Sequence, residues 1–308
     1  MSLISIIIPV LNQAGFLAEA IESYAIQQYP QKEMIIMDGG STDGTLDVIK
    51  RYQHIVTHWE SKPDNGQAHA INKGLKLAKG EIVNWLNADD VLLPDALKVV
   101  GKVFSEDECL EVLCGKCYRI EGEISLRKQN PLNYSQTLLQ ATAEKTMIWP
   151  SMGQPAQFYR KTVFDKIGLL NETLHYSFDR EFWLRYLLHF GQDNARQTDA
   201  FLAVFRLHPD SKTSQSPSLF KEEDEKIIQN IIKQNKRSSP INPRKLKGNY
   251  FGKKTCDYYE NHNYSKARTF AFKTIKTRTI DGKGFAVCAI KILLLPNFVL
   301  EMLRKSSK

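Results

Sequence analysis

Apolar residues follow two different periods over the first hundred positions of the chain. The segments 2–10, 33–38 and 81–87 are mostly apolar and rich in β-branched residues, which is typical of buried strands, and 55–60 is a shorter segment of the same kind. Between them, apolar residues recur at helical spacing. Helices are predicted at 16–28, from the turn at 41–43 to 52, at 67–78, and onward from Pro94. Strands alternating with helices predict an α/β fold: a mixed, mostly parallel sheet with helices on both faces.

Polar residues follow the carboxyl ends of these predicted strands. In open α/β sheets, ligands bind at that edge. The residues that the sequence places there are Asn12, Asp38, Asp64, Asn87 and Asp89. These residues are therefore the first candidates for a ligand site.

The end of the predicted strand 33–38 carries a glycine-rich turn. Asp38 is followed by Gly39-Gly40-Ser41-Thr42-Asp43. This is not the G-x-G-x-x-G pattern, so a dinucleotide-binding fold is disfavoured. A carboxylate at this position can accept hydrogen bonds from a nucleobase or a ribose. The alternative is a capped turn in which Asp38 is solvated.

A second strand end carries adjacent carboxylates. The apolar segment 82–86 ends abruptly in Asn87-Ala88-Asp89-Asp90. Two neighbouring carboxylates are costly to bury unless positive charge lies beside them. Carboxylate oxygens suit Mg²⁺ or Mn²⁺, which share their ligand shell with phosphate oxygens. The pattern predicts a divalent-metal site; the alternative is a polar turn in which Asp90 caps the helix that begins near Pro94.

A third candidate lies in the segment Phe178-Asp179-Arg180-Glu181-Phe182-Trp183. Aromatic residues at helical spacing place Asp179 near a helix N-terminus with aromatic neighbours. Partial burial would raise the pKa of Asp179, whereas the helix dipole and Arg180 would lower it. Such a carboxylate can serve as a base. The alternative is an ordinary N-cap aspartate.

In this order and spacing, the motifs resemble the family 2 glycosyltransferases, inverting enzymes of the GT-A fold that use nucleotide-sugars. The resemblance covers about residues 2–213. A helical region beyond the GT-A domain is expected at the C-terminus. The matching segments are Ile6 to Asn12, Asp38-Gly39-Gly40-Ser41-Thr42-Asp43-Gly44-Thr45, Pro63 to Ala68 with Ala70 to Gly74, Gly80 to Asp90, Gln154-Pro155-Ala156, and Asp179-Arg180-Glu181-Phe182-Trp183.

The resemblance implies a role for each matching residue. Asp179 would be the general base that deprotonates the acceptor hydroxyl. Asp89 would bind a divalent metal, Mn²⁺ or Mg²⁺, that bridges to the diphosphate. His208 lies where related enzymes often place a contact to the diphosphate or the metal; a loop histidine bonded to the backbone is the alternative. The expected nucleotide-sugar-binding residues are Pro9, Val10, Asn12, Asp38, Asp64, Gln67, Asn87 and Ala88.

Asn87 departs from the family pattern, because many members have aspartate there. An amide can still hydrogen-bond a ribose, but it removes one negative charge near the metal.

The function that the resemblance implies is metal-dependent, inverting transfer of a sugar to a hydroxyl acceptor, itself a sugar or a lipid-linked sugar. The setting would be cell-surface polysaccharide, O-antigen or glycolipid biosynthesis. Because of Asn87, a non-catalytic nucleotide-sugar sensor or assembly scaffold stays open as the alternative.

Charge divides the chain near residue 225. Residues 1–225 contain 23 Lys and Arg against 30 Asp and Glu, whereas 226–308 contain 19 against 4. We expect a catalytic domain at 1–215 and a basic helical region at 216–308, with a helix pair at 250–261 and 264–276. The apolar segment 285–303 is interrupted by Lys291 and Pro296, which favours lying in a membrane interface over spanning it.

Two partners are weighed for this basic region. An anionic membrane surface fits its charge; the alternative is that 285–303 packs on the catalytic domain. The sequence contains no recognised nucleic-acid-binding module, so no nucleic-acid partner is expected.

The cysteines and the N-terminus bear on the cellular compartment. Five cysteines form no regular framework, and Cys114 and Cys117 are a lone C-x-x-C without a second ligand pair. Ordinary reduced thiols are expected, which fits a reducing cytosol. Residues 1–10 lack the basic region and cleavage site of a signal peptide. A cytoplasmic protein, peripheral on the inner face of the cell membrane, is predicted.

Overall fold

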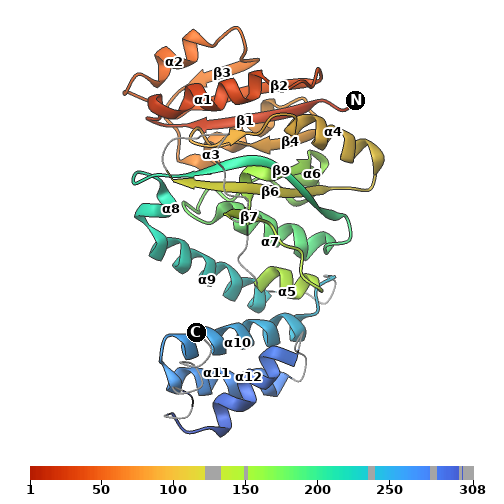
Figure 1. Ribbon diagram of the computed structural model, residues 1–308, viewed down its shortest axis with the longest axis vertical. Helices are drawn as coiled ribbons and strands as arrows, with labels where there is room; N and C mark the ends of the chain where they lie inside the picture. The colour runs from red at the N-terminus through yellow and green to blue at the C-terminus, as the bar shows by residue number, and fades with distance from the viewer. Residues whose placement is uncertain (122–132, 149–151, 235–239, 278–282, 298–299, 301–308) are drawn as a thin grey trace. The chain divides into compact units, whose positions relative to one another are not determined.

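The computed structural model of the chain describes residues 1–121, 133–148, 152–234, 240–277, 283–297 and 300. The chain divides into two compact units, and Figure 1 draws their helices and strands. The first unit comprises Met1–Leu138, Ser151–Tyr186 and Asp193–Lys226, and the second comprises Leu139–Pro150, Leu187–Gln192 and Ile227–Lys308. These units are not the predicted domains 1–215 and 216–308, because each unit combines separate segments of the chain. The domain boundary at residue 215 stays a prediction.

The first unit is built on one mixed sheet. Its order is β3-β2-β1-β4-β8-β6-β9-β5, and β7 pairs with β6. The strands are β1 (Ile4–Val10), β2 (Lys32–Asp38), β3 (His58–Ser61), β4 (Ile82–Trp85), β5 (Val91–Leu92), β6 (Val112–Glu121), β7 (Tyr134–Gln136), β8 (Gln157–Arg160) and β9 (Ala195–Leu207). The first four in spatial order are parallel, and β8 begins a half in which antiparallel pairs join the parallel pair β6–β9.

Helices cover both faces of this sheet, as the sequence predicted. All seven positions of β1 are buried, which requires that its two faces are both covered. The helices of this part of the chain are α1 (Ala14–Ala25), α2 (Thr45–Arg51), α3 (Gln67–Leu77), α4 (Ala96–Glu106), η1 (Gln154–Ala156), α6 (Thr162–Ile167), α7 (Phe178–Phe190), α8 (Lys212–Gln215) and α9 (Pro217–Gln234). The alternating pattern therefore identified the element types correctly, with ends displaced by a few residues.

The second unit is helical. It contains α5 (Ala143–Ile148), α10 (Pro243–Glu260), α11 (Tyr264–Thr277) and α12 (Lys283–Leu294). The predicted helix pair is confirmed, but α10 begins earlier than residue 250. The reason is a strong start signal: the Asn242 side chain accepts hydrogen bonds from the backbone N–H groups of Arg244 and Lys245, and Pro243 opens the helix. Small residues Ala267, Ala271 and Ala289 let the helices approach closely.

No helix among the described residues combines the length and the apolar composition needed to cross a bilayer. The predicted interfacial segment 285–303 is represented by the C-terminal part of α12. The side chains of 285–287 and the residues at 298–299 and 301–303 lie outside the described part of the chain.

Candidate active site

The carboxylate of Asp38 organises the turn that follows β2. It is 1% exposed. Its oxygens accept hydrogen bonds from the backbone N–H groups of Gly40 (3.2 Å) and Ser41 (3.1 Å), from the Ser41 hydroxyl, and from the Ser61 hydroxyl at the end of β3 (2.5 Å). A carboxylate has about four acceptor positions, so the protein itself occupies them. Asp38 is not solvated, and this turn is built before any ligand arrives.

Asn12 and Asp43 fasten the same turn to α1. The Asn12 side chain accepts a hydrogen bond from the backbone N–H of Thr42 (2.8 Å), and the Asn12 N–H donates to the Ser41 hydroxyl (2.7 Å). Asp43 accepts from the N–H groups of Ala14 and Thr45, both at 3.0 Å. Burial acts to raise the pKa of Asp43, but these hydrogen bonds outweigh it and lower the pKa. The starts of α1 and α2 therefore share one carboxylate.

Asp64 reaches the turn from the loop after β3. A Cβ placed on Gly39 would lie 2.8 Å from Asp64 Oδ2, so the two residues are in close contact. Asp64 also accepts from the N–H of Gly66 (2.8 Å), just before α3. The carbonyl of Val10 accepts from the N–H of Gly39 (2.9 Å). Val10, Asn12, Asp38 and Asp64 are thus brought to one edge of the sheet, with Pro9 preceding them on β1.

The segment after β4 forms a chain of side-chain hydrogen bonds. Gln67 donates to Asn87 (2.7 Å), and Asn87 donates to Asp90 (3.1 Å). Asp90 is fully buried and also accepts from the backbone N–H of Arg206 on β9 (3.0 Å). Burial, and then the charge of Asp89, raise the pKa of Asp90 well above its usual range. The predicted role of Asp90 as a cap for α4 is wrong: Asp95 precedes that helix, while Asp90 anchors β9.

Asp89 and His208 face one another across this edge. His208 Nε2 lies 3.1 Å from Asp89 Oδ2. His208 follows β9, and its ring packs against that of Phe16 at 4.6 Å between centroids. Its Nδ1 is buried without a hydrogen-bond partner among the described residues. The His208 ring therefore interacts with a carboxylate and not with a backbone group.

These two side chains are suited to a divalent ion that also binds phosphate. No group of three or more His, Cys, Asp or Glu side chains in the described part of the chain could enclose a metal by itself. Mg²⁺ is commonly bound through one or two carboxylates, with substrate phosphates and waters completing its shell. A carboxylate beside an imidazole fits that pattern, so Asp89 and His208 are the residues that would hold such an ion.

Arg206 supports Asp89, a function that spacing alone did not indicate. Its Nε donates to the Asp89 carbonyl (3.0 Å), and its guanidinium pairs with Glu19 (2.5 Å) and lies over the ring of Phe16 (4.9 Å). The Arg206 side chain is buried, but that of Glu19 is about half exposed, so solvent screens this ion pair in part. The guanidinium brings positive charge close to the adjacent carboxylates.

Aromatic packing fixes the helix that carries Asp179. The Phe182 ring of α7 makes edge contacts with Trp85 of β4 (6.4 Å) and Tyr159 of β8 (5.3 Å) and stacks on Phe164 (4.5 Å). Each such pair adds stability beyond the area it buries. The N-terminal turn of α7 is thereby held against strands β4 and β8.

Asp179 itself is partly buried and remains able to ionise. It accepts a hydrogen bond from the backbone N–H of Arg180 (2.7 Å). Burial raises the pKa of Asp179 to about 6; that hydrogen bond opposes the rise, and the nearby charge of Asp224 adds to it. A carboxylate with this pKa is ionised at neutral pH and still accepts a proton readily. This agrees with the expected opposition between burial and the helix N-terminus.

Glu223 and Lys212 complete the surroundings of Asp179. The Glu223 carboxylate accepts from three consecutive backbone N–H groups, those of His175 (3.1 Å), Tyr176 (3.0 Å) and Ser177 (2.8 Å). The Lys212 ammonium donates to Gln67 (3.0 Å) and to the His175 carbonyl (3.2 Å). Burial lowers the pKa of Lys212, while the charges of Glu223, Asp179 and Asp64 oppose that change. Lys212 therefore lies between the Asp179 region and the Gln67–Asn87 pair.

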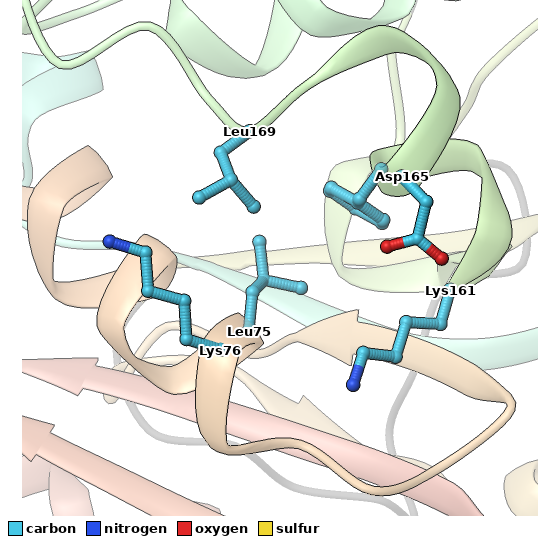
Figure 2. A pocket seen from close by; sticks show the side chains of 6 residues that line it. Leu75, Lys76, Lys161, Asp165 and Leu169 are labelled. Carbon is cyan, nitrogen blue, oxygen red and sulfur yellow. The ribbon is translucent and has the colours of Figure 1, made fainter.

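A cavity of about 240 Å³ lies elsewhere, between α3 and α6 (Figure 2). Leu75 and Leu169 face each other in it, and the Lys76 ammonium points away from them. The Lys161 ammonium donates to the Ala78 carbonyl. The cavity adjoins the C-terminal end of α3, whereas Gln67 of the candidate site begins that helix. The cavity is therefore separate from the site.

The pattern of the sequence and this geometry agree with a comparison against known families. Residues 5–168, more than half of the chain, match the family described as glycosyl transferase family 2. The chain belongs to glycosyltransferase family 2.

Two curated relatives illustrate the similarity. An uncharacterized glycosyltransferase of Rickettsia typhi is 31% identical over 199 residues, which cover 60% of this chain and 58% of the relative. A PGL/p-HBAD biosynthesis glycosyltransferase of Mycobacterium bovis is 29% identical over 187 residues, 59% of this chain and 68% of the relative. The chain thus spans less than two thirds of the length of the first of these.

Solved structures support the GT-A fold. S. aureus TarS 1–349, in complex with UDP-GlcNAc, superposes with a TM-score of 0.65 at 18% identity over 99% of this chain and 92% of that one. The mannosyltransferase PcManGT from Pyrobaculum calidifontis, in complex with GDP-Man and Mn²⁺, gives 0.58 at 16% identity, covering 99% and 80%. At these identities the likeness shows the fold alone.

The departure of this family member at Asn87 has a structural explanation. The Asn87 amide donates to the buried Asp90, a hydrogen bond that an ionised aspartate could not make.

Asn87→Asp would place two carboxylates against one another, and we expect a loss of about 2 kcal/mol in the free energy of unfolding. Urea denaturation at pH 7 would measure it. Asn65→Asp, at an exposed loop position, is the control and should change stability by less than about 0.5 kcal/mol. Equal stability of the two variants would contradict the Asn87–Asp90 contact.

Gly39 allows a close approach that a larger residue would prevent. In Gly39→Ala the new methyl group would displace the Asp64 carboxylate, the flexible end of a side chain. We expect a loss of only about 1 kcal/mol in stability but about tenfold weaker nucleotide binding. Gly15→Ala is the matched control, because no atom lies within 4 Å of its added Cβ and a helical alanine is favoured by about 0.5–1 kcal/mol. Thermal unfolding and nucleotide titration distinguish the two. Unchanged nucleotide affinity in Gly39→Ala would remove Asp64 from the binding residues.

Proposed function

We propose that this family 2 protein is a metal-dependent, inverting glycosyltransferase. It moves a sugar from a nucleotide-diphosphate sugar to a hydroxyl acceptor in the assembly of a cell-surface polysaccharide, an O-antigen or a glycolipid. The observation that carries the proposal is Asp179, a partly buried carboxylate whose pKa of about 6 suits a general base. Lys212 connects its surroundings electrostatically with Asp64 and by a hydrogen bond with Gln67.

The reaction is a single displacement. The acceptor oxygen attacks the anomeric carbon, the bond from that carbon to the phosphate oxygen breaks, and the nucleoside diphosphate leaves. The hydroxyl proton passes to the Asp179 carboxylate. One carboxylate in this role, with attack opposite the leaving group, gives inversion of configuration.

The donor occupies the edge of the sheet formed by the ends of β1, β2 and β4. We assign the base and ribose to the backbone of Pro9 and Val10, to Asn12 and Asp64, and to Asn87 through its amide. Asp38 acts by holding the turn. A direct hydrogen bond from the nucleotide to its carboxylate would require one of the four present hydrogen-bond donors to move away. The remaining residues that we assign to binding of the nucleotide-sugar are Gln67 and Ala88.

Asp89 and His208 would hold the divalent cation. Bound there, Mn²⁺ or Mg²⁺ would supply positive charge to the leaving diphosphate. Arg206 keeps Asp89 in place through its carbonyl. The TarS and PcManGT complexes, with UDP-GlcNAc and with GDP-Man and Mn²⁺, make uridine and guanosine diphosphate sugars the first donors to test.

The compartment is proposed from the thiols. All five cysteines are free, which supports a reducing, cytoplasmic setting.

A donor screen tests the proposal. Each UDP- and GDP-sugar is added with Mn²⁺, and the melting temperature and the release of nucleoside diphosphate are measured. A donor that binds stabilises the folded state, by about 2.7 kcal/mol at one hundred times its Kd. Release that depends on Asp179 supports transferase activity. Binding without any release, with sugar acceptors present, would favour the alternative of a nucleotide-sugar sensor or scaffold, for which Asn87 is the motivating feature.

A further inference from the structure

The helices of the second unit expose large apolar side chains. On α11, Phe272 is 63% exposed and Ile275 is 40% exposed; on α12, Ile290 is 46% exposed and Leu294 is 76% exposed. Single exposed apolar residues are ordinary on a protein surface, whereas a contiguous group marks an interaction site. We call these four residues the α11–α12 apolar surface.

The geometry of α11 places its two members beside α12. Phe272 and Ile275 follow Arg268 at i+4 and i+7, so the three share one stripe of the helix. Arg268 donates hydrogen bonds to the carbonyl of Ile292 in α12 (3.2 Å) and to that of Leu295, the residue after this helix (2.7 Å). The stripe therefore runs along α12, outside the buried contact that includes Ala271.

The members on α12 form a matching stripe. Ile290 and Leu294 are one helical turn apart, next to the buried Ala289 and Ile292, which pack with α11. Both stripes are exposed, and they lie on two helices that pack against each other. Together the two stripes present four large apolar side chains. The rest of the described structure leaves each of them exposed.

The charge around these helices is strongly positive. Residues 243–277, which form α10 and α11, contain nine Lys and Arg against two Asp and Glu. Lys276 and Lys291 are exposed next to Ile275 and Ile290. A partner for the surface must therefore accept apolar side chains and offer negative charge at the same place.

We propose that the α11–α12 apolar surface docks on an anionic lipid bilayer, with the helices lying in the interface plane. Apolar side chains enter the boundary of the acyl chains, while flanking lysines contact the headgroups. A soluble polyanion would leave the apolar side chains in water. A second copy would bring two strongly basic surfaces together, which like-charge repulsion opposes. The proposal does not depend on sugar transfer.

Vesicle flotation with the full chain tests this docking. Vesicles of equal parts phosphatidylcholine and phosphatidylglycerol should carry the protein upward, and vesicles of phosphatidylcholine alone should not. Phe272→Ser with Leu294→Ser should weaken partitioning roughly tenfold for each side chain removed. Lys276→Gln with Lys291→Gln should weaken it about fivefold for each charge and reduce its sensitivity to salt.

Matched surface changes in the first unit control for the loss of any apolar or charged side chain. Ile26→Ser, just after α1, and Lys98→Gln, on α4, alter residues of similar exposure, and both variants should float like the original chain. Circular dichroism confirms that each variant is folded. Nucleoside diphosphate release with a soluble acceptor should stay unchanged in all of them, which separates this test from that of the transferase.

Three results of these experiments would overturn the proposal, and a fourth comes from a soluble competitor. They are no flotation with anionic vesicles, flotation that Phe272→Ser with Leu294→Ser leaves intact, and a concentration-dependent dimer that the same pair of changes dissociates. The last result would assign the surface to a second copy of the chain. Equal binding to a soluble polyphosphate, unaffected by loss of the apolar side chains, would likewise exclude the bilayer.

Discussion

Asp179→Asn is expected to lower the rate of sugar transfer by about 10²–10⁴-fold, the usual contribution of a general base. Asparagine keeps the shape of the side chain and can still accept the hydrogen bond from the Arg180 N–H. Donor affinity should therefore change by less than about threefold. Steady-state release of nucleoside diphosphate and donor titration together measure this separation.

The same variant should be more stable than the original protein at neutral pH. The folded-state pKa of Asp179, about 6, lies above the unfolded value near 4. The folded protein therefore holds this proton more tightly, and the cost of the partly buried charge grows as the pH rises from about 4 to about 6. Each pKa unit is about 1.4 kcal/mol, so the cost above pH 6 is at most about 3 kcal/mol. Asparagine should recover about 1–3 kcal/mol there and nothing below pH 4.

The pH profile and a control complete this test. Transfer by the original protein should rise tenfold per pH unit below about 6 and level off above it, because only the ionised base is active. Glu181→Gln removes a carboxylate two residues away that pairs with Arg185 (2.9 Å), and it should leave the rate within about threefold. Near-normal transfer by Asp179→Asn would refute the assignment of the base.

Asp89→Ala is expected to abolish the effect of Mn²⁺ on donor binding. With a cation held only by His208, donor affinity should fall by about 100-fold or more and become insensitive to chelator. In the original protein, a chelator should produce a loss of similar size. Calorimetric titration of the donor, with Mn²⁺ and with chelator, measures both effects.

A nearby aspartate provides the comparison for Asp89. Asp95 is exposed and precedes α4 with a positive φ of 61°, a conformation that asparagine adopts readily. Asp95→Asn removes one negative charge from the same loop region and should leave the Mn²⁺ response intact. A Mn²⁺ response retained by Asp89→Ala would move the cation site elsewhere.

The local parts of this molecule were predictable, and the long-range contacts were not. Periodicity located β1, β2 and β4 and the helix carrying Asp179, because burial on one or two faces leaves a pattern along the chain. The spatial role of Asp90 was missed because its partner is the N–H of Arg206, more than a hundred residues away. The earlier start of α10 had a local signal, Asn242 followed by proline, that could have been used.

The candidate site shows the same division. Its carboxylates were found because strand ends mark the ligand edge of a parallel sheet. Glu223 and Lys212 were missed, since a polar residue on a helix at the surface has no distinguishing pattern until tertiary structure gives it a partner. The support of Asp89 by Arg206 was missed because Arg206 lies on β9, more than a hundred residues away. The occupied acceptors of Asp38 could not be foreseen for the same reason: Ser61 comes from another strand.

The three N–H groups that converge on Glu223 affect how this protein can be shortened. A fragment ending with the family match at residue 168 lacks Asp179 altogether. A fragment ending at residue 215 keeps Asp179 but loses both Glu223 and Asp224, which pairs with Arg180 at 3.2 Å. All strands of the sheet would remain in this fragment, but the backbone at 175–177, which leads into α7, would lose its hydrogen bonds to Glu223. The smallest fragment that preserves the surroundings of Asp179 therefore extends through the first half of α9, beyond the limit suggested by sequence similarity.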